Sequence, residues 1–487
     1  MAPAKRAPRV ESLGLERMPT GISGFDDLLG GGLPRDRTTL VLGSPGCGKT
    51  LFALQTLVNG ARRFDEPGIF VAFEESTRNL IANSASFDWN VERLSKKGIF
   101  FLDARLPHAV IRGGEFDLLG LLAAVSAKQA QTGARRVVFD GIDILLTLLD
   151  DPLSERREMH RLTEWLSDRN LTGLVTCKSE EGGGSVSRGG YLQSLTDCVI
   201  NLQNKLVGNH PVRLMRVAKC RGLAHATGEV PFAITASGLK VISYAPAVQN
   251  APAQKISTGI DSLDGMLAGG YLRGSSVLIS GSPGTAKSTL AGVFIAAAAR
   301  RREHCLYVSF DEAAGQVVRN LAAVGVRLGP HVKSGLLRVA SERKVEKNAV
   351  EHVARIIEQI ETHDVKCLVV DPISALASPG FGSMAEELVV RLLDYARSCQ
   401  VTVVCTCTRA STLLGTGDGL VEDSAAGVSS IADTWIHLSN LALDGHRQRA
   451  LTIVKARGIG HSNQIRALRL TSRGINLGDF LQPGASA

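Results

Sequence analysis

The apolar positions of this chain fall into short continuous runs that alternate with longer, periodically apolar segments. The runs TTLVLG (38–43) and SVLISG (276–281) each pass through a Gly-rich turn into such a segment. Strands buried on both faces of a parallel sheet have continuous apolar runs, whereas amphipathic helices repeat every three or four residues. We therefore predict strands at the two runs, helices over roughly Thr50–Arg63 and Ser288–Arg302, and an α/β fold whose sheets are covered by helices.

The same pattern occurs twice, which indicates an internal duplication. TGISGFDDLLGGGL begins at Thr20 and TGIDSLDGMLAGGY at Thr258, each 23 residues before its Gly-rich turn, since 43 − 20 and 281 − 258 are equal. Further matched blocks are VAFEES and VSFDEA, RRVVFDGI and KCLVVDPI, and KCRGLAH and KARGIGH. Four matched blocks in one order are typical of a repeat. The predicted organisation is an N-terminal tail (1–16), a first domain (17–245), a linker (246–254) and a second domain (255–487).

The composition agrees with ordinary globular domains. The 487 residues are 44% hydrophobic and 21% charged, and no apolar run is long enough to cross a bilayer. The first residues lack the apolar core of a signal peptide, so we expect a cytoplasmic location and no membrane partner. The nine cysteines are scattered without a CxxC pair and are expected to be reduced.

Each Gly-rich turn has the composition of a phosphate-binding loop, or P-loop. In such a loop the backbone N–H groups point at the phosphates of a nucleoside triphosphate, the lysine neutralises phosphate charge and the last hydroxyl binds Mg²⁺. The predicted ATP-binding residues are Gly43, Ser44, Pro45, Gly46, Cys47, Gly48, Lys49, Thr50 and the adjoining Leu51 in the first loop, and Gly281, Pro283, Gly284, Thr285, Ala286, Lys287, Ser288 and the adjoining Thr289 in the second.

An aspartate ends an apolar strand in each half, at Asp140 and Asp371. A carboxylate at this place can complete a Mg²⁺ site beside the P-loop hydroxyls of Thr50 and Ser288. A single aspartate at the end of a strand is more often a turn residue or a helix cap. Because both halves have one at matched spacing, we interpret the pair as metal ligands.

A pair of acidic residues follows the first apolar strand after each P-loop helix, at Glu74–Glu75 and at Asp311–Glu312. A carboxylate beside the terminal phosphate can accept a proton from an attacking water or hydroxyl. The alternative is a solvated acidic strand end. The recurrence in both halves favours a catalytic role for these four residues.

Two substitutions distinguish the second half. Ala286 stands where the first loop has Gly48, and Asp311 stands where the first acidic pair has Glu74. The added methyl group can restrict the approach of the loop backbone to phosphate, and the aspartate carboxylate lies one methylene nearer its own backbone. We expect slower turnover in the second half.

The KxRGxxH blocks lie too far along the chain to serve their own P-loops easily. Alternate residues of a strand share a face, so the lysine and arginine of each block can act together. We predict that they reach the terminal phosphate held by a neighbouring subunit, in the manner of arginine fingers, rather than forming a basic surface hairpin. The residues concerned are Lys219, Arg221, His225, Lys455, Arg457 and His461.

Together these motifs resemble the KaiC family, whose members are tandem RecA-like P-loop ATPases with parallel-rich sheets flanked by helices. The resemblance covers nearly the whole chain. It implies a homohexamer of two stacked rings with ATP and Mg²⁺ at the subunit boundaries, together with signalling protein partners. It also implies ATP hydrolysis in the N-terminal ring and phosphoryl transfer onto adjacent serines or threonines in the C-terminal ring.

The resemblance assigns roles to further positions. In GVSSIADTWIHL, Ser429 and Ser430 stand where the family has its phospho-acceptor pair, with Asp311 as the general base for them. Without the resemblance, the two serines would be interpreted as the end of a loop. Positions that match nucleotide contacts of the family are Ser86, Arg213 and Arg449.

Two other functions remain open. A net charge of +8 would fit a RecA-type DNA-dependent ATPase, but the basic residues are dispersed and aromatic residues make up only 5% of the chain. The sequence therefore argues against a nucleic-acid partner. An ATP-binding sensor scaffold with an inactive second domain would fit the changes at Ala286 and Asp311.

Overall fold

The computed structural model describes two compact units. The first comprises Met1–Lys205 and Arg213–Ser243, and the second comprises Leu206–Val212 and Tyr244–Ala487. Residue 254 is the only part of the expected linker within the described residues. These residues are 15–105, 118–149, 151–179, 188–207, 210–244, 254–342, 348–376, 382–408, 431–443, 446–472 and 474–480.

The main sheet of the first unit has the strand order β11-β10-β9-β8-β3-β7-β6-β4-β5 within the described ranges. Strands β3 to β8 pair in parallel, and β9, β10 and β11 extend the sheet by antiparallel pairing. These strands are β3 (Thr38–Gly43), β4 (Gly68–Ala72), β5 (Ile99–Asp103), β6 (Arg136–Asp140), β7 (Thr172–Lys178), β8 (Cys198–Val207), β9 (His210–Cys220), β10 (Val230–Thr235) and β11 (Gly238–Val241).

A short antiparallel pair and several helices complete the first unit. They are β1 (Arg17–Met18), β2 (Leu33–Pro34), α1 (Phe25–Leu28), α2 (Lys49–Arg63), α3 (Thr77–Asn83), η1 (Ser84–Ser86), α4 (Val91–Leu94), α6 (Leu118–Thr132), α7 (Ile142–Leu146), α8 (Pro152–Asp168) and α9 (Arg188–Leu195).

The second unit repeats this topology. Its main sheet, read from the other edge, has the order β22-β21-β20-β19-β14-β18-β17-β15-β16 in the described part of the chain. Its strands are β12 (Lys255–Ile256), β13 (Tyr271–Leu272), β14 (Ser276–Gly281), β15 (Cys305–Ser309), β16 (Leu337–Ser341), β17 (Cys367–Asp371), β18 (Thr402–Thr408), β19 (Thr434–Leu443), β20 (His446–Ala456), β21 (Arg466–Thr471) and β22 (Gly474–Phe480). Its helices are α10 (Asp261–Met266), α11 (Lys287–Arg300), α12 (Ala314–Ala323), α13 (Gly329–Lys333), α14 (Ala349–Thr362), η2 (Ile373–Leu376) and α15 (Gly382–Ser398).

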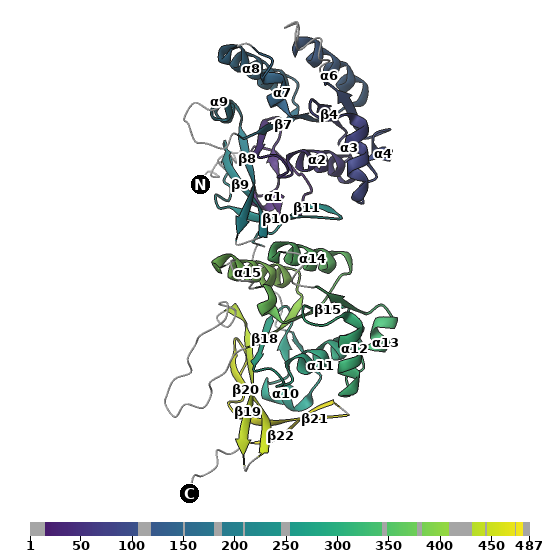
Figure 1. Cartoon of the computed structure of the whole chain (residues 1–487), viewed down its shortest axis with the longest axis vertical. Helices are drawn as coiled ribbons and strands as arrows, with labels where there is room; N and C mark the ends of the chain where they lie inside the picture. Colours follow the sequence, from purple (N-terminus) through teal and green to yellow (C-terminus); the bar gives the residue numbers. More distant parts are fainter. Residues whose placement is uncertain are drawn as a thin grey trace, which may run out of the picture. The chain divides into compact units, whose positions relative to one another are not determined.

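The structure confirms the prediction of an α/β fold with parallel-rich sheets. Both apolar runs form the strands expected of them, and the two helices begin one residue earlier than predicted, at Lys49 and Lys287. Helices lie on both faces of each sheet (Figure 1). Along β3, Val41 packs in the cluster under α2, while Leu40 and Leu42 pack in the opposite cluster with α6 and α8. Burial on both faces is the reason for the continuous apolar runs.

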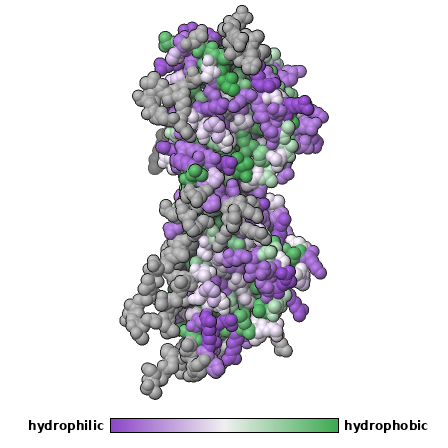
Figure 2. Space-filling model, in the orientation of Figure 1, coloured by the Kyte–Doolittle hydropathy of each residue, from purple (hydrophilic) through white to green (hydrophobic). Residues whose placement is uncertain are grey.

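The face drawn in Figure 2 is largely hydrophilic, with hydrophobic residues in separate small areas. Among the described residues, no helix combines the length and the apolar character needed to cross a membrane. All nine cysteines are free, as expected, and Cys405 and Cys407 are buried in β18.

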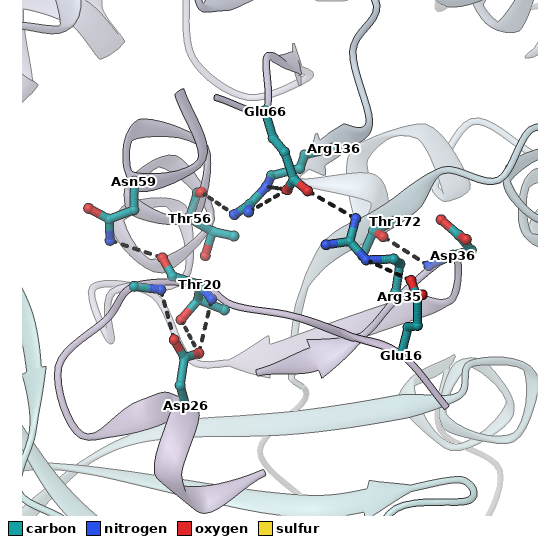
Figure 3. Close-up of polar contacts among 11 residues, drawn as sticks. Glu16, Thr20, Asp26, Arg35, Asp36, Thr56, Asn59, Glu66, Arg136 and Thr172 are labelled. Carbon is teal, nitrogen blue, oxygen red and sulfur yellow. Dashed lines mark hydrogen bonds and ion pairs between the residues drawn. The ribbon is translucent and has the colours of Figure 1, made fainter. Parts of the chain in front are cut away.

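A buried ion-pair cluster stabilises the amino edge of the first sheet (Figure 3). Arg136 is fully buried and donates to Glu66 Oε2 from Nε (2.8 Å) and Nη2 (2.5 Å). It also donates to the carbonyl oxygen of Thr56 at 3.0 Å, and Arg35 donates to Glu66 Oε1 at 3.0 Å. Burial alone would raise the pKa of Glu66, but the two guanidinium groups bring the net shift below the ordinary value. The cluster therefore stabilises the fold only while Glu66 is ionised.

Glu66→Gln is expected to lower the free energy of unfolding of the first unit by about 3 kcal/mol at pH 7, because the buried Arg136 loses its counter-charge. Since the pKa of Glu66 is lowered on folding, the difference from the parent should shrink below the ordinary glutamate pKa of about 4.3. Urea titration with pulsed hydrogen exchange, read on peptides of β4 and β6, measures both effects.

Glu229→Gln serves as the control, because Glu229 pairs with Lys205 at 2.8 Å in an exposed ion pair. This variant should unfold at the same urea concentration as the parent. A Glu66→Gln protein that behaves in the same way would show that the cluster contributes nothing to stability.

Candidate functional site

Each P-loop joins the middle strand of its sheet to the following helix. Gly43 ends β3 so close to β8 that an added Cβ would lie 2.4 Å from the carbonyl oxygen of Leu202. Gly48 has a φ of 105° and precedes α2, whose first N–H groups and dipole face the loop. The loop thus gathers backbone donors at the carboxyl edge of the sheet, where an anion can bind.

The P-loop lysines are held by their own loops. Lys49 Nζ donates to the carbonyl oxygens of Gly43 (2.8 Å) and Ser44 (3.0 Å). Lys287 makes the equivalent bonds in the second loop at 2.8 and 2.9 Å. An ammonium group has three donors, so these bonds orient each lysine and leave one N–H for a phosphate oxygen.

Asp140 lies buried at the end of β6, beside the first P-loop. It accepts hydrogen bonds from Thr50 Oγ1, at 3.0 Å on Oδ2 and 3.2 Å on Oδ1, and from Thr176 Oγ1 at 2.7 Å on Oδ1. Burial raises the pKa of Asp140, and the two threonine hydroxyls act in the opposite direction. A buried carboxylate of this kind gains from a bound cation, and Mg²⁺ prefers carboxylate and hydroxyl oxygens. The residues therefore fit a Mg²⁺ site.

Asp371 occupies the same place at the end of β17, but one of its hydroxyl partners differs from those of Asp140. Tyr307 donates to Oδ2 at 2.5 Å, and Thr406 donates to Oδ1. The Ser288 hydroxyl lies near the phenol group of Tyr307. The second site thus has the same oxygen ligands for Mg²⁺, with a tyrosine hydroxyl bonded to the aspartate.

The acidic pairs lie directly after β4 and β15, and the structure distinguishes the two members of each. The second member accepts from an asparagine on the next helix: Asn83 donates to Glu75 at 2.6 Å. Asn320 donates to Glu312 at 2.8 Å. Glu74, the first member of the first pair, instead forms an ion pair with Lys178 at 2.9 Å.

The two arginines expected at the nucleotide lie beside the P-loop of their own unit. Arg449 Nε donates to the carbonyl oxygen of Gly284 at 3.0 Å. Burial raises the pKa of the Cys47 thiol, and the nearby charges of Lys49 and Arg213 oppose that shift. Both arginines therefore add positive charge next to a P-loop.

The KxRGxxH cations lie at the amino ends of the parallel strands, opposite the edge of the sheet that carries the P-loop. Lys219 Nζ donates to the carbonyl oxygens of Gln193 (2.6 Å) and Thr196 (2.7 Å), at the end of α9. The Arg221 backbone is bonded to Asp197, which is bonded in turn to Thr38 at the start of β3. From Thr38, β3 runs five residues further to Gly43 at the start of the P-loop, a distance of about 16 Å.

The second block has the same placement. Arg457 N donates to Asp433 O at 2.8 Å, and Asp433 N donates to Ser276 O, at the start of β14, at 2.9 Å. Burial lowers the pKa of Lys219 and of Lys455. His225 Nδ1 lies 3.0 Å from the carbonyl oxygen of its neighbour Ala226. These blocks are therefore remote from the P-loop of their own unit.

The remaining predicted residues differ in how the structure places them. Leu51 and Thr289 lie in the first turn of α2 and α11, and Ser86 lies in η1 with its hydroxyl on the carbonyl oxygen of Asn83. Ser429 and Ser430 lie outside the described residues.

Sequence reasoning missed several residues that contact the site. The matched positions of the repeat could have identified the threonines and asparagines, since the spacing from Glu75 to Asn83 equals that from Glu312 to Asn320. No repeat could have identified Tyr307 or Lys178, because the other half has a different residue at each place. The missed residues are Asn83, Thr176, Lys178, Tyr307, Asn320 and Thr406.

Comparison with known proteins agrees with the geometry of both sites. A family model described as "ATPase: KaiC" matches residues 18–245 and 256–480. The circadian clock protein KaiC2 of a Synechocystis strain is 38% identical over 473 residues, which cover 96% of this chain and 82% of that protein. The circadian clock oscillator protein KaiC of Parathermosynechococcus lividus is 32% identical over 478 residues, which cover 97% and 87% of the two chains. The protein of that name in Prochlorococcus marinus is 32% identical over 479 residues, or 98% and 93%.

The second P-loop contains a backbone conformation that favours glycine. Ala286 has a φ of 82° and caps α11, in the place of Gly48. Ala286→Gly is expected to stabilise the second unit by about 1 kcal/mol, because an L-residue in the left-handed region costs about 1–2 kcal/mol. Urea titration with pulsed hydrogen exchange, read on peptides of α11 and β14, measures the change.

Gly48→Ala is the matched variant in the first unit. An added Cβ at Gly48 would meet Ile234 at 3.6 Å, an ordinary contact, so its expected destabilisation comes from the backbone alone. If Ala286→Gly lowers the stability of the second unit, the left-handed conformation of Ala286 is not a source of strain.

Proposed function

Because this chain belongs to the KaiC family of ATPases, we propose that it hydrolyses ATP and phosphorylates its own serines, working as a homohexamer with ATP and Mg²⁺ at the subunit boundaries. One observation carries the proposal: a P-loop lysine and hydroxyl lie beside a strand-end aspartate in each unit. Membership of the family also favours this function over a DNA-dependent motor.

At the first site, the residues described above would carry out ATP hydrolysis. Lys49 and the loop N–H groups would hold the phosphates, while Thr50 and Asp140 would hold Mg²⁺, which offsets phosphate charge. Glu74 would accept the proton of the attacking water. Its ion pair with Lys178 has to open first, so we expect Lys178 to move away from Glu74 when ATP binds.

The second acid of each pair would have a supporting role. Glu75 and Glu312 are held by Asn83 and Asn320, and these bonds fix the backbone that carries Glu74 or Asp311. We therefore propose Glu74 and Asp311 as the bases and their neighbours as positioning residues.

At the second site, phosphoryl transfer would go to Ser429 or Ser430. The serine oxygen forms a bond to the γ-phosphorus while the bond from that phosphorus to the bridging oxygen of ADP breaks, and the hydroxyl proton passes to Asp311. The assignment of these acceptors comes from their likeness to the acceptor segment of the family.

The position of the KxRGxxH blocks supports assembly of several subunits. Lys219 and Arg221 lie at the amino end of the sheet, and β3 spans about 16 Å from that end to the P-loop of the same unit, which is too far for contact with a phosphate bound there. In a ring, the same edge of one subunit can face the P-loop edge of the next. We therefore propose that each site is completed by cations of the adjoining copy.

The names of the relatives refer to circadian clocks. For this chain we propose a timing or signalling role with protein partners, in which the phosphorylation state of the chain is the signal. A cytoplasmic location remains a prediction.

Incubation with ATP and Mg²⁺ should add one or two phosphates per chain, because both acceptor serines lie in the segment that resembles the family's. Intact-mass spectrometry counts them directly. The double variant Ser429→Ala, Ser430→Ala should gain no phosphate and still hydrolyse ATP, whereas Ser439→Ala, in β19, should behave like the parent.

If the parent gains no phosphate while Lys49→Ala abolishes hydrolysis, the protein is an ATPase without kinase activity. Its second unit would then be a nucleotide sensor. Phosphate that persists in the double alanine variant would place the acceptor elsewhere.

Mixing two inactive variants tests whether sites are completed by a neighbour. Lys49→Ala lacks a working first P-loop, and Arg221→Ala lacks the proposed finger; both carry Lys287→Ala to remove hydrolysis by the second unit. Unfolded together and refolded at equal amounts, they should regain about a quarter of the hydrolysis rate of the Lys287→Ala parent, because one random interface in four is intact. A mixture as inactive as its components would show that Arg221 acts within its own subunit or not at all.

A further inference from the structure

The two proposed nucleotide sites differ at one buried position next to the strand-end aspartate. Tyr307 of β15 lies opposite Val369 of β17 in the register in which Phe70 of β4 lies opposite Val138 of β6. Tyr307 is 1% exposed and Phe70 is fully buried. The exchange therefore adds one hydroxyl group to a matched buried environment.

This hydroxyl donates to a carboxylate oxygen of the strand-end aspartate. In the first unit, the equivalent oxygen accepts from the P-loop hydroxyl. Asp140 Oδ2 accepts from the P-loop Thr50 at 3.0 Å, whereas Asp371 Oδ2 accepts from Tyr307 at 2.5 Å. The other oxygen is occupied alike in both units, by Thr176 or by Thr406. Ser288, the counterpart of Thr50, lies near the tyrosine hydroxyl.

The difference bears on cation binding. A P-loop hydroxyl that donates its proton to the carboxylate turns its oxygen lone pairs outward, toward a cation. The first site has this arrangement. In the second site the phenol hydroxyl takes this place on the carboxylate, and its short bond to Oδ2 draws on the charge of that oxygen. A cation that binds there competes with the phenol hydroxyl for the same carboxylate oxygen.

We propose that Tyr307 is a positioning residue that makes the second nucleotide site bind its divalent cation more weakly than the first. The proposal rests on the proposed function, because it concerns the Mg²⁺ of those ATP sites. It gives the two units different cation requirements through one hydroxyl, independently of the changes at Ala286 and Asp311.

Metal binding tests this without measuring activity. The full-length protein is saturated with a non-hydrolysable ATP analogue, Mn²⁺ is titrated in place of Mg²⁺, and free Mn²⁺ is counted by electron paramagnetic resonance. The parent should show two classes of site. Tyr307→Phe should tighten the weaker class about three- to tenfold, the range expected for removal of one competing hydrogen bond.

The reciprocal variant Phe70→Tyr should weaken the stronger class by a similar factor. Tyr271→Phe is the matched control, because Tyr271 is a buried tyrosine of the same unit that packs edge-on against Phe294 at 5.5 Å. It should leave both classes unchanged. Circular dichroism and thermal unfolding establish that each variant folds.

A weaker class that stays unchanged or loosens in Tyr307→Phe overturns the proposal, and so does a single class of sites in the parent. If Tyr307→Phe does not fold, an unchanged stronger class in Phe70→Tyr overturns it equally. Failure of the parent to take up the analogue has a different meaning, because it overturns the proposed function itself.

Discussion

Both proposed sites depend on one interaction. Hydroxyl groups donate hydrogen bonds to an aspartate that ends a strand, at the sheet edge that carries the P-loop. Parallel pairing of β3 with β7 and of β7 with β6 brings Gly43 and Asp140 to the same edge. The sheet register, rather than a loop, therefore sets the spacing between the phosphate cradle and the metal ligand. Because the carboxylate is buried there, a cation stabilises it, and the same burial that holds the sheet together prepares the site for Mg²⁺.

The duplication shows which parts of this arrangement tolerate change. Both units keep the strand order, the P-loop lysine bonds, the threonine beside the aspartate and the asparagine bound to the second acid. They differ at three places that modify the site but do not form its phosphate cradle. These are the loop residue before the lysine, the length of the proposed base, and the hydroxyl that donates to Oδ2 of the strand-end aspartate. One scaffold can thus support a hydrolase in one unit and a transferase in the other, since the two proposed activities share the phosphate cradle and differ in the acceptor.

The two edges of each sheet carry residues with different proposed roles. Nucleotide-binding groups gather at the carboxyl ends of the parallel strands, while the KxRG cations lie at the amino ends, on carbonyl groups that end α9 in the first unit. A rigid sheet cannot bring its two edges together. An assembly in which one copy supplies cations to the next is therefore the simplest way for these residues to serve a phosphate, and nucleotide binding and subunit contact would then depend on each other.

The sequence alone determined the α/β class, the duplication, both P-loops and their strands, because each of these is written in consecutive residues or in the repeat. Only the tertiary structure decided which hydroxyls meet the aspartates, which acid of each pair accepts from an asparagine, and that Arg213 and Arg449 lie at their own loops. The sequence predicted that the KxRG blocks do not serve their own P-loops, and the structure showed that they lie at the amino end of the sheet. These relations join strands that are neighbours in the sheet but distant along the chain. Hydrophobic periodicity specifies that a strand is buried, but not which strand lies beside it, and the chemistry of Asp371 is decided by such a neighbour, Tyr307.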